Sequence, residues 1–224
     1  MSLIDVVALS AEKCKYPIKA KLKYATKKNF VGRPISGYHE DAKDFALMTP
    51  SAAEQLCQVQ QYLNETLGLG LYIYDSYRPK RAVQDFMFWS KQPPESEYEL
   101  VRKEKHYPHI RKDQLFDLGY VAEDSGHCYG NTVDLVLIDI ASGRKLPMGA
   151  RYDYMDTLSH IDVDLPRISE EDLANRTILS EAMQKFGFEP YQNEFWHFSY
   201  QGKAGRETQE PMDVEMTAQC RGLK

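Results

Sequence analysis

Apolar residues recur along the chain with two periods, one typical of helices and one typical of strands. Between Pro50 and Gly68 they are spaced by three and four residues, which predicts a helix that begins at the proline and ends at the glycine. A second helical pattern ends at Gly187 and is preceded by Ser169 and a group of acids, as at a helix N-terminus. Pro79 is expected to start a further, shorter helix.

Between these helical stretches lie segments rich in β-branched and aromatic residues, which we expect to form strands. They are residues 71–77, 133–138 and 188–200. Residues 1–48 show no long helical period, and within them the segment 29–38, which contains glycine and proline, is interpreted as ordered loop with short strands. The polar segment 91–120 is interpreted as an exposed lid or loop. Since no repeat or linker interrupts the pattern, we expect a single domain over residues 1–224, with a tail from about residue 201 that is free to fray.

Composition and charge exclude several classes of protein. The hydrophobic fraction of 42% and the charged fraction of 27% are those of an ordinary globular protein. A net charge of -5 without a run of lysines or arginines argues against a nucleic-acid-binding surface. No apolar stretch approaches the ~20 residues that span a bilayer, so we expect no membrane partner. The first residues lack a signal-peptide pattern, which favours the cytoplasm; a periplasmic location stays open if a leader was removed.

The cysteines give no sign of a disulfide framework. They are Cys14, Cys57, Cys128 and Cys220. They are scattered without a Cys-x-x-Cys pair, which suits free thiols better than disulfides or a thiolate zinc site.

The candidate chemistry begins in the segment 125–134. His127 and Asp134 lie on either side of Gly130, which lets the loop fold back at the start of an expected buried strand. A buried carboxylate is costly unless a cation compensates it, and a divalent metal would satisfy both side chains. His197 offers a third ligand near the other end of the chain. A catalytic zinc ion takes three such ligands and keeps a fourth position for water.

A hydrolase built on this metal also needs a general base and a donor for the oxyanion. Glu194, three residues before His197, is the candidate base. Side chains alternate along a regular strand, so Glu194 must lie in a turn or at a bulge if both groups are to face one metal. Arg78, at a strand-to-helix junction, could supply a planar fork of donors. Local sequence alone favours an exposed arginine in a turn.

Each of these elements has a plainer interpretation when taken alone. His127 could be a satisfied core histidine and Asp134 a capping aspartate. His106 and His109, which flank a proline, are more typical of an exposed loop than of a metal site. Two histidines and one aspartate also form the facial triad of non-haem iron oxygenases, although an oxygenase has no need of Glu194. The residues by themselves leave these alternatives open.

Short motifs in order along the chain add a resemblance. They are Tyr24-Ala-Thr, Asn29-Phe-x-Gly-x-Pro, Asp75-x-Tyr-Arg-Pro-Lys-Arg-Ala-Val83, Gly119-Tyr-Val-Ala, Ser125-x-His127-x-x-Gly130-x-x-x-Asp134, Pro147-Met-Gly, Asn175-Arg and Glu194-Phe-Trp-His197. Together they resemble the zinc D-alanyl-D-alanine peptidases, and within them most closely the VanX-type D-alanyl-D-alanine dipeptidases. The resemblance covers roughly residues 24–200.

This resemblance implies an α+β fold, with a central antiparallel sheet that carries the zinc site and helices packed against one side of it. It implies one zinc ion per chain, held by His127, Asp134 and His197. It also implies that Glu194 is the general base and that Arg78 stabilises the tetrahedral oxyanion. The expected enzyme is a zinc metallopeptidase that hydrolyses D-alanyl-D-alanine to two D-alanines.

The resemblance further implies a small substrate pocket. Asp153 would bind the free ammonium group of the dipeptide, and Tyr24, Tyr38 and Ser125 would line the pocket. A carboxylate at a fixed distance from the metal admits one residue before the scissile bond and excludes long peptides. An open cleft would favour the alternative, a D,D-carboxypeptidase or another cell-wall peptide hydrolase of the same family. The expected partner is the dipeptide, and a homo-oligomer stays open.

The sequence also departs from the family pattern. Phe195 replaces the usual tryptophan, a change that keeps an aromatic body. Gly126 stands where a serine is common, which removes a hydroxyl from the pocket rim. The tail after Tyr200 does not match the family pattern, so no function is assigned to it. Retention of both Glu194 and Arg78 argues against a non-catalytic zinc-binding module.

Overall fold

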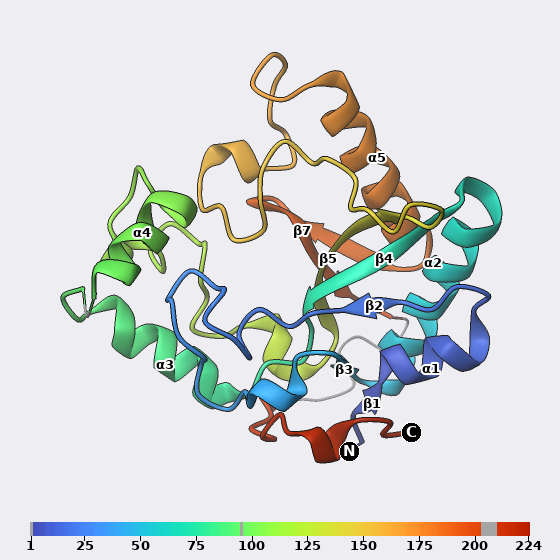
Figure 1. Ribbon diagram of the computed structural model, residues 1–224, viewed down its shortest axis with the longest axis horizontal. Helices are drawn as coiled ribbons and strands as arrows, with labels where there is room; N and C mark the ends of the chain where they lie inside the picture. The colour runs from blue at the N-terminus through green and yellow to red at the C-terminus, as the bar shows by residue number, and fades with distance from the viewer. Residues whose placement is uncertain (1, 95, 203–209) are drawn as a thin grey trace.

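A five-stranded sheet forms the centre of the molecule (Figure 1). The computed structural model describes residues 2–94, 96–202 and 210–224. The strands of the sheet, in spatial order, are β2 (Lys19–Ala20), β4 (Leu69–Asp75), β5 (Thr132–Asp139), β7 (Glu194–Tyr200) and β6 (Phe188–Tyr191). With helices flanking this sheet, the fold is α+β, as expected.

The strands that carry the site are antiparallel, as expected, but one edge strand makes the sheet mixed. β4, β5, β7 and β6 pair antiparallel, but the edge strand β2 runs parallel to β4. Parallel neighbours require a crossover connection, and the chain between β2 and β4 supplies one that includes a long helix. A separate small sheet pairs β1 (Ile4–Asp5) with β3 (Leu47–Met48).

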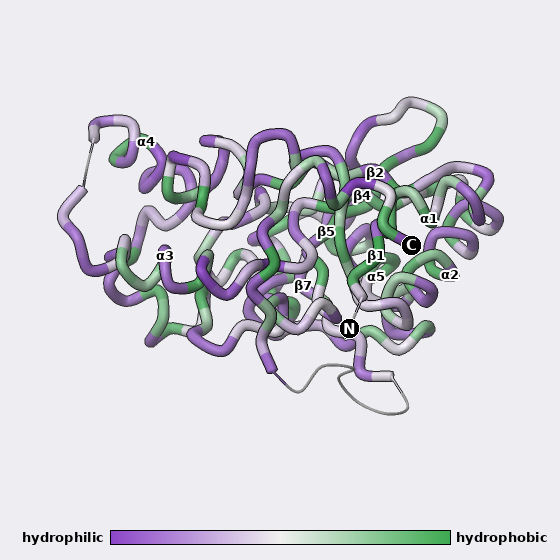
Figure 2. The backbone as a smooth tube through the Cα atoms, turned by 90° about the horizontal axis from the view of Figure 1, so that it is seen from below, coloured by the Kyte–Doolittle hydropathy of each residue, from purple (hydrophilic) through white to green (hydrophobic). Residues whose placement is uncertain are grey.

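The two longest helices pack against the sheet and each other. α2 (Pro50–Leu67) begins with the proline and ends at Gly68, which adopts a left-handed conformation, as the pattern predicted. α5 (Glu170–Lys185) begins with a capping box between Ser169 and Asp172. Hydrophobic positions follow the central strands, whereas the peripheral loops are largely hydrophilic (Figure 2). In the described part of the chain no helix combines the length and apolar composition needed to cross a membrane.

At the end of the molecule away from α1 and α2 lie α3 (Lys80–Ser90) and α4 (Glu97–His106) (Figure 1). α3 follows Pro79 as predicted, but α4 falls in the segment interpreted as a loop. The pattern there is inverted, because α4 buries Glu99 and His106 and leaves its apolar residues Leu100 and Val101 exposed. Because the residues that α4 buries include polar ones, the sequence has no hydrophobic period that would reveal this helix.

The short strands of the first 48 residues lie outside the segment 29–38 where they were expected; that segment forms turns and a single bridge at Tyr38. The same region also contains a helix that the pattern did not predict. This helix, α1 (Val6–Lys13), has eight residues, of which only Val6 and Ser10 are buried. It is held at its start by the Asp5 carboxylate, which accepts hydrogen bonds from the amides of Val7 and Ala8. So short a helix with so narrow a buried face produces almost no periodic signal.

The described end of the tail is packed, in contrast to the expected fraying. Met216 is fully buried and forms a bridge with Tyr38. The amide of Met212 donates to the carbonyl of Cys128, in the loop that carries His127. Near the terminus, the carbonyl of Leu223 accepts a hydrogen bond from the amide of Asp5. The part of the tail over 203–209 lies outside the described residues.

Candidate active site

The register of the sheet places three chemically important side chains in one row. Asp134 of β5 pairs with His197 of β7 on one side and with Asp75 of β4 on the other. Side chains directly opposite each other on antiparallel strands approach to about 5 Å. The Nδ1 atom of His197 accordingly lies 3.1 Å from the Oδ1 atom of Asp134. Strand pairing alone thus joins residues 63 positions apart in the sequence.

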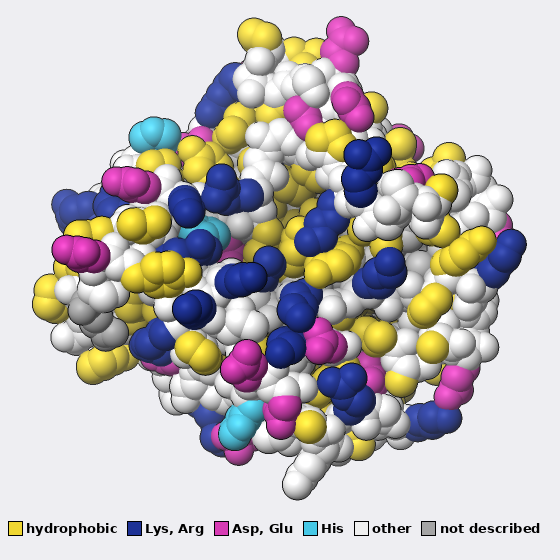
Figure 3. All heavy atoms as spheres, in the orientation of Figure 1, with side chains coloured by type: hydrophobic (Ala, Val, Ile, Leu, Met, Phe, Trp, Pro, Cys, Tyr) yellow, Lys and Arg dark blue, Asp and Glu magenta, His cyan; other side chains and the backbone are white. Residues whose placement is uncertain are grey.

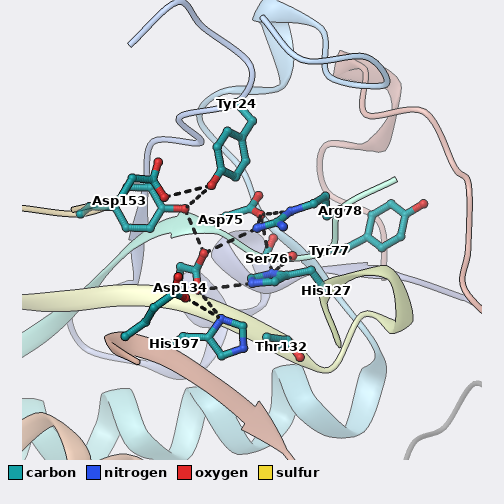
Figure 4. A network of polar contacts seen from close by, with 12 residues as sticks. Tyr24, Asp75, Ser76, Tyr77, Arg78, His127, Thr132, Asp134, Asp153 and His197 are labelled. Atoms are coloured by element: carbon teal, nitrogen blue, oxygen red, sulfur yellow. Dashed lines mark hydrogen bonds and ion pairs between the residues drawn. The ribbon is translucent and has the colours of Figure 1, made fainter. Parts of the chain in front are cut away.

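His127 reaches the same place from the loop before β5. The loop is a short 3-10 turn over Gly126–Tyr129 that ends at Gly130, whose φ of +75° turns the chain into the strand. His127 donates its Nδ1 hydrogen to the carbonyl of Ser76, 2.6 Å away. This fixes the tautomer, so the Nε2 lone pair faces the Asp134 Oδ1 atom at 3.3 Å (Figure 4).

These three residues suit a metal ion. One ligand atom from each of His127, Asp134 and His197 lies within 4.8 Å of the others. The His127 Nε2 and Asp134 Oδ1 atoms are buried, and neither has a hydrogen-bond partner within the described part of the chain. Buried polar atoms are normally satisfied, so a divalent cation between them accounts for both. Burial opposes ionisation of Asp134, but the adjacent imidazoles outweigh it and hold the pKa well below its usual range.

Glu194 meets the geometric condition set by the sequence. It is the first residue of β7 and pairs with Tyr191 across a tight turn, and the register shifts between Pro190 and Tyr191. The irregularity turns Glu194 to the side of His197, with 3.5 Å between the Oε2 and Nδ1 atoms. Burial, and then the carboxylates of Asp134 and Asp153, raise the pKa of Glu194 well above its usual range. A dication at the three ligands would act in the opposite direction, because it favours the carboxylate.

Arg78 is buried, so the interpretation as an exposed turn residue is wrong. Its Nε and Nη2 atoms lie 3.0 and 2.9 Å from the Oδ2 atom of Asp75, at the end of β4. Its Nη2 atom is also 3.8 Å from Asp134. The guanidinium packs over the ring of Tyr24, 5.0 Å from its centre. Arg78 therefore reaches the cavity as a fixed cation.

Asp153 is held in an unusual conformation beside the same cavity. Its φ of +57° is in the left-handed region, which a residue other than glycine adopts only when its surroundings enforce it. Tyr24 donates its hydroxyl to the Oδ1 atom at 3.0 Å, while the buried Oδ2 atom has no partner in the described residues. Burial, and then the charge of Asp134, raise the pKa of Asp153 to about 8.

A cavity of about 320 Å³ joins these groups. Its lining includes the three candidate ligands together with Glu194, Arg78, Asp153, Tyr24 and Ser125. Tyr38 is not among the residues that line it. The Tyr38 hydroxyl instead donates to the Oδ1 atom of Asp75 at 2.7 Å, so this tyrosine stands behind Arg78.

Three residues to which the sequence analysis gave no role in the site support it, and one of them, His106, is buried and not part of an exposed loop as predicted. Asp75 fixes Arg78, Tyr152 donates its hydroxyl to the Asp134 Oδ2 atom at 2.9 Å, and the Nδ1 atom of His106 donates to the carbonyl of Asp153 at 2.8 Å. Asp75 carried a usable signal, since an acid ending a buried strand before Arg78 needs a cationic partner. Tyr152 and His106 gave none, because their partners lie far away in the sequence.

The departures from the family pattern have local explanations. A side chain at Gly126 would place its Cβ atom 2.5 Å from the Thr132 hydroxyl, so Thr132 would have to shift to make room for it. Phe195 is buried, and the guanidinium of Arg176 lies 4.1 Å from its ring centre.

Two further expectations about single residues are met. All four cysteines are free. His109 contacts Asp156 on the surface, away from buried His106.

Comparison with known proteins identifies the family. The sequence profile of peptidase family M15, described as D-ala-D-ala dipeptidase, matches residues 10–216. The match therefore extends beyond Tyr200 and includes Met216, which corrects the view that the tail lies outside the family pattern. A D-alanyl-D-alanine dipeptidase of Enterococcus faecium is 40% identical over 176 residues, 79% of this chain and 82% of that protein.

Two further relatives carry the same name. The D-alanyl-D-alanine dipeptidase of Streptomyces coelicolor is 40% identical over 183 residues, 81% of this chain and 85% of its own length. That of Escherichia coli is 29% identical over 184 residues, 81% of this chain and 78% of its own length. With a family match over most of the sequence and these relatives, the chain belongs to the D-ala-D-ala dipeptidase family of metallopeptidases.

Proposed function

We propose that this protein is a zinc-dependent dipeptidase that hydrolyses D-alanyl-D-alanine to two D-alanines. The observation that carries the proposal is the pairing, within one small cavity, of a three-residue metal site with an unpartnered carboxylate oxygen on Asp153. The first group suits amide hydrolysis, and the second suits an ammonium ion. The names of the relatives agree with this substrate.

His127, Asp134 and His197 would hold the zinc ion through two imidazole nitrogens and one carboxylate oxygen. When bound, zinc polarises the carbonyl and lowers the pKa of a water molecule to about 7. The orienting contacts are already in place, because His127 donates to the Ser76 carbonyl and Asp134 accepts from Tyr152. This is the support that a catalytic metal site requires from the residues around its ligands.

Glu194 would take the proton from the attacking water and pass it to the nitrogen of the leaving D-alanine. Its burial beside His197 keeps this carboxylate away from bulk solvent. Arg78 would donate to the oxygen that becomes negative as the carbonyl carbon turns tetrahedral. Since Asp75 holds the Nε and Nη2 atoms of Arg78, the rest of the guanidinium already faces the cavity before a substrate binds.

Asp153 would select the substrate by pairing with its free amino group. The charge of a bound ammonium ion would favour the carboxylate and offset the burial that raises the pKa of Asp153. Tyr24 holds one carboxylate oxygen and leaves the other for the ammonium. An acylated amino group has no charge to pair, so we expect N-blocked peptides to be poor substrates.

Steady-state hydrolysis of D-Ala-D-Ala, L-Ala-L-Ala and N-acetyl-D-Ala-D-Ala, with metal analysis of the same sample, tests the proposal. We expect rapid cleavage of the free D,D-dipeptide alone, with one zinc ion per chain. Comparable cleavage of the acetylated substrate would remove the role of Asp153 and point to a D,D-carboxypeptidase. Bound zinc without hydrolysis of any of the three would contradict the proposed activity.

A Glu194→Gln variant separates the base from the metal site. We expect it to retain zinc and to lose about 10²–10⁴-fold in kcat, because proton transfer is removed while the ligands stay. Glu189→Gln, which changes an exposed acid on the neighbouring strand β6, is the matched control and should be fully active. If Glu194→Gln were as active as the parent, another residue would be the base.

A further inference from the structure

A second cavity, of about 560 Å³, lies beside the active site and is unusually rich in positive charge. Its cationic lining residues are Lys23, Lys28, Arg102, Lys145 and Arg151. None of the described residues that line it is acidic. Figure 3 shows lysine and arginine side chains gathered around an apolar hollow on this face of the molecule. A protein with a net charge of -5 would not be expected to concentrate cations in this way by chance. We call this the basic cavity.

The cations of the basic cavity are not neutralised by the protein itself. Among the described residues, none of the five forms an ion pair with an aspartate or glutamate. Arg102 uses its guanidinium on the carbonyl of Asn29 and on His106, which are both neutral partners. Five cations around one cavity repel one another, and apart from the nearby charge of Asp153, which favours protonated Lys23, an anion from solution is needed to offset that repulsion.

The floor of the basic cavity holds two of these cations close together. The ammonium of Lys145 lies 3.8 Å from the ring centre of Tyr72 and 4.7 Å from that of Tyr74, and the ammonium of Lys23 lies 5.2 Å from Tyr74. Partial burial against these rings, and then the charge of Lys23, lower the pKa of Lys145 to about 8. Burial likewise lowers the pKa of Lys23. Their donors are thus held at adjacent positions.

The basic cavity is separate from the active-site cavity. Tyr152 and His106 line it without lining the active site, and they form the wall between the two. On the far side of that wall, Tyr152 donates to Asp134 and His106 donates to the carbonyl of Asp153. A ligand of the basic cavity would therefore sit behind the residues that hold the metal site, with no contact to the metal ligands.

We propose that the basic cavity is a binding site for an anion with two or more negative charges, carried by phosphate or carboxylate groups. Arginine guanidinium groups fit the planar edge of either group, and lysine ammonium groups supply point charges beside them. The rings of Tyr74, Tyr98 and Tyr152, which line the cavity, can contact an apolar body that joins the charged groups. The inference does not depend on the reaction catalysed at the metal site.

Isothermal titration of the zinc-loaded protein tests this site. The probes are glucose 1,6-bisphosphate, tricarballylate and uncharged glucose, in buffer without phosphate or carboxylate. We expect saturable binding of at least one anionic probe, weakened by added potassium chloride, and none of glucose. Tighter binding of the bisphosphate would identify a phosphate ester as the ligand class, and tighter binding of tricarballylate a carboxylate. Failure of both anions to bind more tightly than about 10 mM would overturn the proposal.

Matched lysine variants locate the bound anion. Lys145→Gln should weaken binding about tenfold, the loss expected for one charge-assisted hydrogen bond. Lys185→Gln removes the same charge from a similar position outside the cavity, 4.2 Å from the ring of Tyr62, and should leave affinity unchanged. Equal losses of affinity in both variants would show that binding depends only on the net charge of the protein and not on the position of Lys145. Unchanged affinity in Lys145→Gln, with displacement of the probe by D-Ala-D-Ala, would place the anion at the metal centre. Either result rejects the proposed site.

Discussion

At the scale of single residues, the direction of Arg78 depends on Asp75. The hydrogen bond from Nε and the ion-pair contact of Nη2 with the Asp75 Oδ2 atom come from one edge of the guanidinium, so the other edge can face the cavity. The hydroxyl of Tyr38 holds the second oxygen of the same carboxylate. A chain of Tyr38, Asp75 and Arg78 therefore sets the position of the cation in the site.

Asp75→Asn tests this chain. The amide keeps the shape of the side chain but loses the charge that holds Arg78, so we expect a fall of about 10–100-fold in kcat with zinc content unchanged. Tyr38→Phe removes only the outer hydrogen bond and should cost less than about tenfold. Steady-state kinetics and metal analysis on both variants measure the difference. Equal activity of Asp75→Asn and the parent would show that Arg78 needs no such support.

His106 makes stability depend on pH. Burial, and then the charge of Arg102, lower the pKa of His106 from 6.5 to about 3 in the folded protein. Between these values the unfolded chain binds a proton that the folded chain does not, so stability is fully present above pH 6.5 and is lost as the pH falls toward 3. At pH 5 the loss is about 2 kcal/mol.

Urea unfolding at pH 5 and pH 7 measures this loss, with His106→Asn as the comparison. Asparagine can still donate to the carbonyl of Asp153 but does not titrate. We expect the parent to lose about 2 kcal/mol more than the variant over this interval. Parallel losses in the two proteins would show that His106 is not the titrating group.

At the scale of elements, the turn before β5 positions His127, and its geometry depends on Gly130. The φ of +75° is available to glycine, and a Cβ atom there would meet the Leu3 side chain at 2.9 Å. Gly68, which ends α2, has a similar φ of +66°, but a Cβ atom would meet nothing within 4 Å. The two glycines share a conformation and differ in the space around them.

This difference gives a paired prediction. Gly68→Ala should cost about 1 kcal/mol of unfolding free energy, from the backbone conformation alone. Gly130→Ala should cost about 2–4 kcal/mol, since overpacking adds to the strain, and should also weaken zinc retention because His127 shifts. Chemical denaturation and zinc release to a chelator measure the two effects. Similar costs at both positions, with equal zinc retention, would contradict this account of the turn.

The elements themselves were predictable to different degrees. α2, α3 and α5 show an apolar period or a capping signal in the sequence, and the structure confirms them. α4 stayed hidden because the side chains that it buries include Glu99 and His106. Glu99 accepts hydrogen bonds from Trp89 and Lys112, so its burial depends on partners that come from other segments. No local pattern carries that information.

At the scale of the whole molecule, the described segment 210–224 packs against the loops that support the site. Met216 bridges to Tyr38, whose hydroxyl supports Asp75 and through it Arg78. The backbone of the tail also contacts the loop that carries His127, through the hydrogen bond from Met212 to Cys128. The tail thus supports the loop that carries His127, and through Tyr38 and Asp75 it supports Arg78. We expect its packing to affect the stability of the whole domain.

Met216→Ala removes a fully buried side chain and should destabilise the protein by about 2–4 kcal/mol. Val214→Ala, two residues earlier and 46% exposed, should cost less than about 0.5 kcal/mol. Equilibrium denaturation of both variants tests the role of the tail. A similar small effect at both positions would mean that the tail contributes little to the fold.

The sequence by itself determined the main helices, the central strands and the residue types of the site. These follow from local period, from capping and turn residues, and from motifs whose members lie within a few positions of each other. It also set the condition that Glu194 lies at a turn or bulge. The register shift in β6 and β7 confirms this condition.

Only the tertiary structure decided which distant groups act together. The row of Asp75, Asp134 and His197 depends on strand register, which many sequences of the same pattern could satisfy differently. The place of Tyr38 behind Arg78 and the basic cavity beside α4 arise from segments that meet only when the chain is folded. Hydrogen bonds and charges act over a few ångströms of space whatever the separation in sequence, and that separation is all that a linear pattern records.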